Sequence, residues 1–221
     1  MVFVASTTLH EASHALVAKW GGDPTAYAAG QVSLSPIPHM RREPFGMVVL
    51  PLVSLAISGW PFGFASAPYD PVWAQRHPRR AAWMSLAGPG ANFALLLLAG
   101  LLIRAGGMAG WFEPPASVSF SQLTAPVASP LGDTLGLTLS VLFSMNLLLF
   151  VLNLLPVPPL DGSGALGLLL SEDATRRYQE WVAHSGIAWI GLLVAWQLID
   201  HIFWPAFLFS VGLLYPGVSY G

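Results

Sequence analysis

Long apolar runs separated by short polar connections dominate the chain. A helix that crosses a bilayer needs about 20 largely apolar residues. Runs near or above this length lie at residues 2–20, 45–60, 80–103, 135–155 and 182–214. A shorter apolar helix is expected at residues 162–170. The last run has room for one long span or two short ones, and a division would fall at Asp200, His201 and Pro205. The pattern predicts an all-α polytopic bundle of about five to six transmembrane helices.

The first connection has a different periodicity. Residues 31–35 alternate polar and apolar side chains before Pro36 and Pro38, which is typical of a short strand or hairpin. We therefore expect a short membrane-associated β-hairpin after the first helix. Residues 60–78 and 106–133 are rich in turn-forming residues and are expected as loops. Because no repeat or low-complexity run divides the chain, we interpret residues 1–221 as a single transmembrane domain.

Composition places this bundle in a membrane. The chain is 54% hydrophobic and 9% charged, whereas a soluble domain has roughly 25% charged residues. We expect a multi-pass integral protein of the cell membrane, with the lipid bilayer as its surroundings. A net charge of -2 and the lack of a basic run argue against nucleic-acid binding. If every run crosses the membrane, the basic residues divide almost evenly between the two sides, so the positive-inside rule gives no orientation.

The first apolar run contains the pattern H-E-x-x-H. His10 and His14 are four residues apart, so on a helix both imidazoles face the same point. Two neutral imidazoles are good zinc ligands, and Glu11 beside them suits activation of a bound water. An ionisable trio in an apolar helix is costly in lipid, which indicates a functional site. The alternative is a chance pattern on a solvent-facing helix.

A catalytic zinc usually takes three protein ligands. The chain has no cysteine, so the third must be a histidine or a carboxylate. Asp161 is the best candidate, because it directly follows the prolines that end the run at 135–155. Asp161 could instead only cap the short helix at 162–170. Asn153 offers an amide that could stabilise an oxyanion, or could simply bond a neighbouring helix.

Three motifs together resemble a known family. H-E-A-S-H at residues 10–14, G-P-G-A-N at residues 88–92 and N-L-L-P-V-P-P-L-D-G at residues 153–162 occur in the order found in the site-2 protease family of intramembrane zinc metalloproteases. The resemblance covers most of the chain. The resemblance implies that each chain binds one Zn²⁺ through three ligands and has two catalytic residues. The implied metal ligands are His10, His14 and Asp161, and the implied catalytic residues are Glu11 as general base and Asn153 on the oxyanion or substrate.

Two further residues keep open roles. Asn92, in the second motif, is expected either to serve helix packing with the neighbouring glycines or to line the substrate route. His39 is expected either as an interfacial loop residue or as an auxiliary or autoinhibitory metal ligand.

The resulting expectation is an intramembrane zinc endopeptidase that cuts within or near the transmembrane segment of a membrane-anchored protein, using a zinc-activated water. One alternative is a membrane-anchored zincin acting on peptides outside the bilayer, with Glu172 or Glu180 as third ligand. The other is a non-catalytic metal-binding or transport protein, in which Glu11→Gln would keep full function. The sequence does not specify the oligomeric state, the physiological substrate or the membrane face on which the site opens.

Overall fold

A computed structural model describes residues 1–59, 61–127 and 130–220. Trp60, where the second predicted span ends, lies outside this described part. The elements, in chain order, are α1 (Val2–Gly21), α2 (Thr25–Ala28), α3 (Pro36–Arg42), the π-helical turn η1 (Phe45–Val49), α4 (Leu50–Ser58), α5 (Pro71–Arg76), α6 (Pro78–Met108), β1 (Phe112–Glu113), β2 (Ala125–Pro126), α7 (Pro130–Asn153), α8 (Asp161–Ala165), the 3₁₀ turn η2 (Leu166–Leu168), α9 (Glu172–Ser185) and α10 (Ala188–Leu214).

Three of the described helices are long and apolar enough to cross a membrane. They are α6, residues Leu131–Asn153 of α7, and α10. The sequence predicted five to six spans, and that count is not confirmed. The apolar stretch Phe45–Ile57 is too short, because its 13 residues rise only about 20 Å. Of the two options that the sequence left open for the last run, the structure has the single long helix, since α10 continues through Pro205 and no break forms there.

Helix α1 has 20 residues, which as an α-helix rise about 30 Å and are long enough to span. It does not meet the same apolar criterion as the other three, because its middle carries serine, threonine, histidine and glutamate. Most of these polar side chains are buried in the bundle. The helix ends where Gly22 adopts a left-handed conformation (φ 99°) and its N–H bonds the carbonyls of Ala18 and Lys19.

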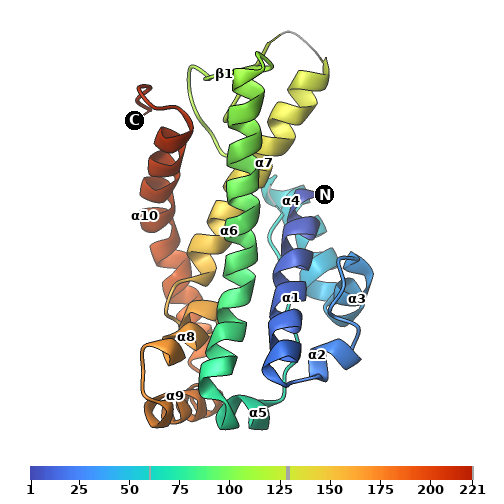
Figure 1. The fold of residues 1–221 in the computed structure, drawn as a ribbon, viewed down its shortest axis with the longest axis vertical. Coiled ribbons are helices and arrows are strands. Elements are labelled where there is room, and N and C mark those ends of the chain that lie inside the picture. Colours follow the sequence, from blue (N-terminus) through green and yellow to red (C-terminus); the bar gives the residue numbers. More distant parts are fainter. Residues whose placement is uncertain (60, 128–129, 221) are drawn as a thin grey trace.

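Helix α6 is the centre of the bundle. Figure 1 shows this green helix running the length of the molecule, with the blue α1 beside its lower half and α7 and α10 behind and to the left. Its main packing partners are α1 and α7. A hydrophobic core joins α6, α7 and α10; its fully buried members include Ile103, Leu123, Phe207 and Val211. The chain thus packs its apolar helices around a polar stretch of α1.

The hairpin predicted after the first helix is not formed. Residues 31–35 have bends instead of strands, and α3 begins at Pro36. The physical reason is that Pro36 and Pro38 suit the first turn of a helix, and Ser35 caps it by accepting a hydrogen bond from the N–H of Ile37. The described strand pair, β1 and β2, is antiparallel and lies in the long loop between α6 and α7.

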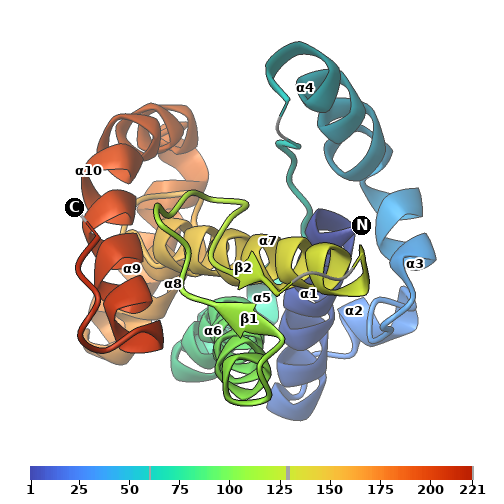
Figure 2. The same ribbon diagram turned by 90° about the horizontal axis from the view of Figure 1, so that it is seen from above.

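The segment between α1 and α6 returns to the end of the molecule where α1 stops. The indole N–H of Trp73 and the guanidinium of Arg80 both donate to the carbonyl of Gly21, each at 3.1 Å. The carboxylate of Asp23 accepts from the N–H of Asp70. Figure 2 shows α4 standing apart from the main helices, and its Leu52 and Ile57 side chains are exposed. Residues 22–77 therefore leave and rejoin the bundle at one end.

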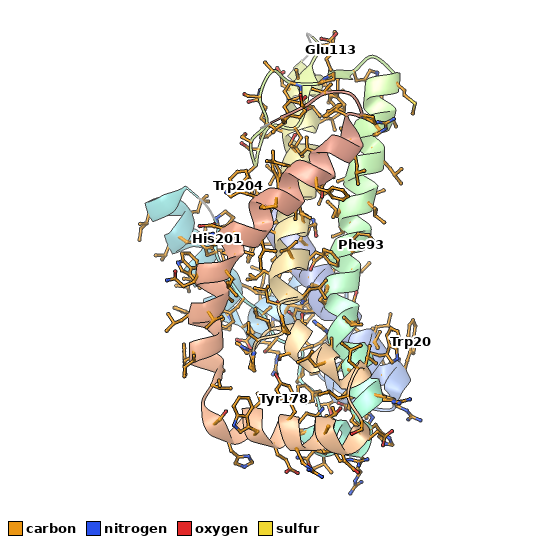
Figure 3. All side chains as sticks on the ribbon, turned by 90° about the vertical axis from the view of Figure 1, so that its left-hand side faces the viewer. Trp20, Phe93, Glu113, Tyr178, His201 and Trp204 are labelled. Carbon is orange, nitrogen blue, oxygen red and sulfur yellow. The ribbon has the colours of Figure 1, made fainter. Side chains whose placement is uncertain are left out.

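Because residues 22–77 return to one end of the bundle, the basic residues do not divide evenly between its two ends, as they would if every apolar run crossed the membrane. Helix α9 meets the same end, because Arg176 donates to the carbonyl of Gln75. The basic residues gathered there are Lys19, Arg76, Arg79, Arg80, Arg176 and Arg177. Trp20 and Tyr178 lie toward this end and Glu113 at the opposite one (Figure 3). At that opposite end, Arg104 donates to the carbonyl of Leu214. The basic side chains thus favour one end of the bundle.

Candidate metal centre

Helices α1 and α8 bring three ligating side chains together. Nε2 of His10 lies 3.0 Å from Oδ2 of Asp161, and Nε2 of His14 lies 3.3 Å from the same oxygen. The two Nε2 atoms are 3.0 Å apart. His10 and His14 are buried, and the Asp161 side chain is 22% exposed. Within the described part of the chain, these residues form the one cluster of three potential metal ligands.

The hydrogen bonds around this cluster show that a cation fits it. A neutral imidazole has one N–H and one lone pair. Nδ1 of His10 donates to Oδ1 of Asn92 at 2.6 Å, and Nδ1 of His14 donates to the carbonyl of Met84 at 2.7 Å. Each Nε2 is therefore left with a lone pair, and no donor among the described residues hydrogen-bonds Oδ2 of Asp161. Three lone pairs converge with no proton between them.

The spacing suits zinc. Tetrahedral zinc binds nitrogen and oxygen at about 2.0–2.2 Å, which separates neighbouring ligand atoms by about 3.3 Å. The three observed separations, 3.0, 3.0 and 3.3 Å, come close to that value. Nitrogen and carboxylate donors are also those that zinc accepts in catalytic sites.

Glycine 88 on α6 makes room for this arrangement. A Cβ atom at Gly88 would clash with Nε2 of both His10 and His14. The sequence suggested helix packing for this glycine motif, and the structure shows what packs there: the two imidazoles of α1. Gly90, two residues on, has open space where its Cβ would be. The close approach is therefore specific to position 88.

Asp161 reaches the centre because the chain turns sharply after α7. Residues 154–160 fold back in short turns, and the N–H of Leu160 bonds the carbonyl of Val157. A Cβ atom at Gly162 would meet the carbonyl of Leu154, so only glycine fits this close approach. Asp161 is the first residue of α8, and the capping position belongs to Leu160. Asp161 is therefore not the N-cap that one sequence interpretation allowed.

Of the two proposed catalytic residues, Glu11 lies on the helix that carries both histidine ligands, and Asn153 ends the helix that precedes the turn to Asp161. Glu11 on α1 is 4% exposed, and its carboxylate makes no hydrogen bond or ion pair with another described residue. Asn153 is the last residue of α7, and its amide donates to the carbonyl of Leu149 at 3.0 Å. The second amide hydrogen of Asn153 has no partner among the described residues.

The other candidates are placed differently. His39 is buried in α3 and bonds the carbonyl of Ser33; it is not a member of the ligand cluster. Glu172 pairs with Arg176 on exposed α9, and Glu180 also lies on α9, so neither joins the cluster. The contact between Asn92 and His10 was not predicted from the sequence. The feature that could have indicated it is an amide side chain within an apolar span.

Comparison with known proteins agrees with this geometry. The model of peptidase family M50 matches residues 1–195. The chain belongs to this family. Peptidase family M50 is the site-2 protease family that the three motifs resemble, so that prediction is confirmed. The family membership and the ligand cluster together make zinc the metal of this centre.

The relatives carry consistent names. The chain is 27% identical over 205 residues to "Putative zinc metalloprotease YwhC" of Bacillus subtilis (strain 168), a match that covers 93% of this chain and 83% of that protein. It is 31% identical over 177 residues to a protein of the same description, Rip2 of Mycolicibacterium smegmatis, covering 79% of this chain and 58% of Rip2. No solved structure matches the chain. The family and these names identify this M50 chain as a metalloprotease. The chain covers somewhat more than half of the length of Rip2.

Proposed function

We propose that this M50 metalloprotease is an intramembrane zinc endopeptidase, which hydrolyses a peptide bond within or near the transmembrane segment of a membrane-anchored protein. The observation that carries the proposal is the convergence of three unprotonated ligand atoms beside a buried glutamate, in a bundle whose other main helices are apolar. Buried ionisable groups among membrane helices are costly and are retained for function.

Zinc, when bound, supplies Lewis-acid activation of water and of the scissile carbonyl. The chain supplies proton transfer. Glu11 is buried and unpaired within the described structure, so its carboxylate is available to take the proton of the attacking water and to deliver it to the leaving amine. The free amide hydrogen of Asn153 is available to stabilise the oxyanion that develops on the carbonyl.

Water and substrate require a route to this centre. The Asp161 side chain is 22% exposed, whereas that of His10 is 9% exposed, so the site opens on the side of α8. That side faces the end of the bundle with the clustered basic residues (Figure 1). By the positive-inside rule this end is cytoplasmic, and the site would receive water from that face. A helical substrate would have to unwind locally, because its amides are engaged in its own hydrogen bonds.

The test combines zinc content with cleavage of a model transmembrane substrate in detergent. Wild type should hold about one zinc per chain and cut the substrate. Glu11→Gln should keep zinc and lose cleavage, and Asp161→Ala should lose zinc. Glu180→Gln, on exposed α9, is the matched control and should behave as wild type. Full zinc in Asp161→Ala with loss in Glu180→Gln would move the third ligand to α9 and favour the zincin acting outside the bilayer. Full activity in Glu11→Gln would refute the hydrolytic role.

A further inference from the structure

A chain of buried hydrogen bonds leads from the centre of the bundle to His10. Oδ1 of Asn92 accepts from Nδ1 of His10 at 2.6 Å, and Nδ2 of Asn92 donates to Oδ1 of Asn146 at 2.9 Å. Nδ2 of Asn146 donates to Oγ of Ser6 at 2.9 Å and to the carbonyl of Leu142 at 2.8 Å. Ser6, Asn92 and Asn146 are all 0% exposed. This series of hydrogen bonds links α1, α6 and α7.

The direction of every bond in this chain is fixed from its far end. The carbonyl of Leu142 can only accept, so Asn146 must turn its NH₂ group toward it. The second hydrogen of that NH₂ group goes to Ser6, which leaves only Oδ1 of Asn146 for Asn92. Asn92 must therefore present its own NH₂ group to Asn146 and its Oδ1 to His10. An acceptor at that position requires the proton of His10 to be on Nδ1.

We propose that Asn92, held by Asn146, is a positioning residue that fixes His10 in its Nδ1-protonated form and keeps the Nε2 lone pair directed at the metal. This inference rests on the proposed metal site. Partners of this kind on the second nitrogen of a metal-binding histidine orient the ring and raise its basicity. His14 needs no such chain, because its Nδ1 donates directly to the backbone carbonyl of Met84.

A purely structural role is the competing explanation, since buried amides also hold membrane helices together. The two explanations differ at position 92. Asn92→Leu has nearly the same shape but offers His10 no acceptor. Asn92→Asp keeps an acceptor for Nδ1 of His10, as in carboxylate–histidine–zinc sites, and its protonated carboxyl also keeps a donor for Oδ1 of Asn146. A positioning role predicts that aspartate rescues what leucine loses.

The experiment uses the full chain in detergent, with Zn²⁺ affinity measured by chelator competition and the His10 ring observed by NMR with nitrogen-15-labelled histidine. Wild type should show zinc at Nε2 and a hydrogen-bonded Nδ1–H at low field. Asn92→Leu should lose that signal and bind zinc about 10–100-fold more weakly. Asn92→Asp should keep the signal and most of the affinity. Asn146→Leu should weaken both, by less than Asn92→Leu, because Asn92 is then free to rotate.

The control is Ser144→Ala. Ser144 is buried on α7 two residues from Asn146, and its hydroxyl has no hydrogen-bond partner in the described structure. Its variant should match wild type in both readouts. The inference is overturned if Asn92→Leu keeps the His10 signal and the zinc affinity, or if Asn92→Asp fails as Asn92→Leu does. If Asn92→Leu does not fold, Asn92→Asp and Asn146→Leu decide by the same readouts.

Zinc affinity and the His10 signal do not depend on hydrolysis. The experiment can therefore refute the role of Asn92 without refuting the proposed function, and the reverse. Normal zinc binding and a normal His10 signal in a wild type that cuts no substrate would refute the endopeptidase and leave the role of Asn92 intact. Cleavage by wild type, together with an unchanged His10 ring in Asn92→Leu, would refute only the role of Asn92.

Discussion

The contact between Gly88 and the two imidazoles leads to a sharp prediction for Gly88→Ala. The added Cβ would lie 2.5 Å from Nε2 of His10 and closer still to Nε2 of His14. Ordinary contact begins at about 3.4 Å, so an imidazole must move by roughly 0.9 Å or α6 must move away. Metal–ligand distances tolerate only about ±0.2 Å, so the displaced ring can no longer bind.

The expected size of the effect follows from this displacement. Loss of a direct ligand should exceed the about 10–100-fold typical for changes to groups behind the ligands. We therefore expect zinc affinity to fall more than about 100-fold, or roughly 2.8 kcal/mol. Cleavage should fall with it. The assay is chelator competition for zinc in parallel with substrate cleavage, and thermal unfolding in detergent checks that the variant folds.

Gly90→Ala is the matched control for this prediction. It makes the same substitution two residues away on the same helix, where the new Cβ meets no atom within 4 Å. Replacing a helical glycine by alanine stabilises by roughly 0.5–1 kcal/mol, so Gly90→Ala should bind zinc normally and unfold no earlier than wild type. Equal zinc affinity in the two variants would refute the claim that Gly88 makes room for the ligands.

Three other predictions follow from the same geometry. Asn153→Ala should lower kcat about 10²–10³-fold and leave zinc content unchanged; equal losses of zinc and activity would assign Asn153 to metal binding instead. Treatment with a strong chelator should abolish cleavage, and added Zn²⁺ should restore it, whereas activity that survives metal removal would exclude a zinc mechanism. Gly191→Ala places a Cβ against the carbonyl of Pro158 and should destabilise the packing of α10 on that turn by about 1–3 kcal/mol, measured as earlier thermal unfolding; unchanged unfolding would show that this contact relaxes freely.

The sequence carried most of the information about the candidate centre. Helical spacing alone put His10 and His14 on one face, and the prolines before Asp161 indicated a turn in place of a continued helix. Both features are local, so the sequence expresses them directly. The structure adds the long-range contact, a separation of about 3 Å between α1 and α8 that no local pattern contains.

The errors arose where tertiary context decides between local options. Alternation at residues 31–35 fits a strand, but Pro36 and Pro38 suit a helix start equally well, and burial of His39 accompanies the helical choice. Hydropathy at residues 45–57 resembles a span, yet the bonds from Trp73 and Arg80 to Gly21 show that the segment returns to the same end. The role of Asn92 depends on partners 54 and 82 residues away, beyond any periodicity argument.

The most direct test of the central claim is to map the bond that the enzyme cuts. A membrane-anchored substrate with a long soluble segment would be incubated with wild type and with Glu11→Gln, and the products identified by mass spectrometry. The account predicts a cut within or near the transmembrane segment, made by wild type and absent with Glu11→Gln. Cleavage confined to the soluble segment, or made equally by both proteins, would contradict it.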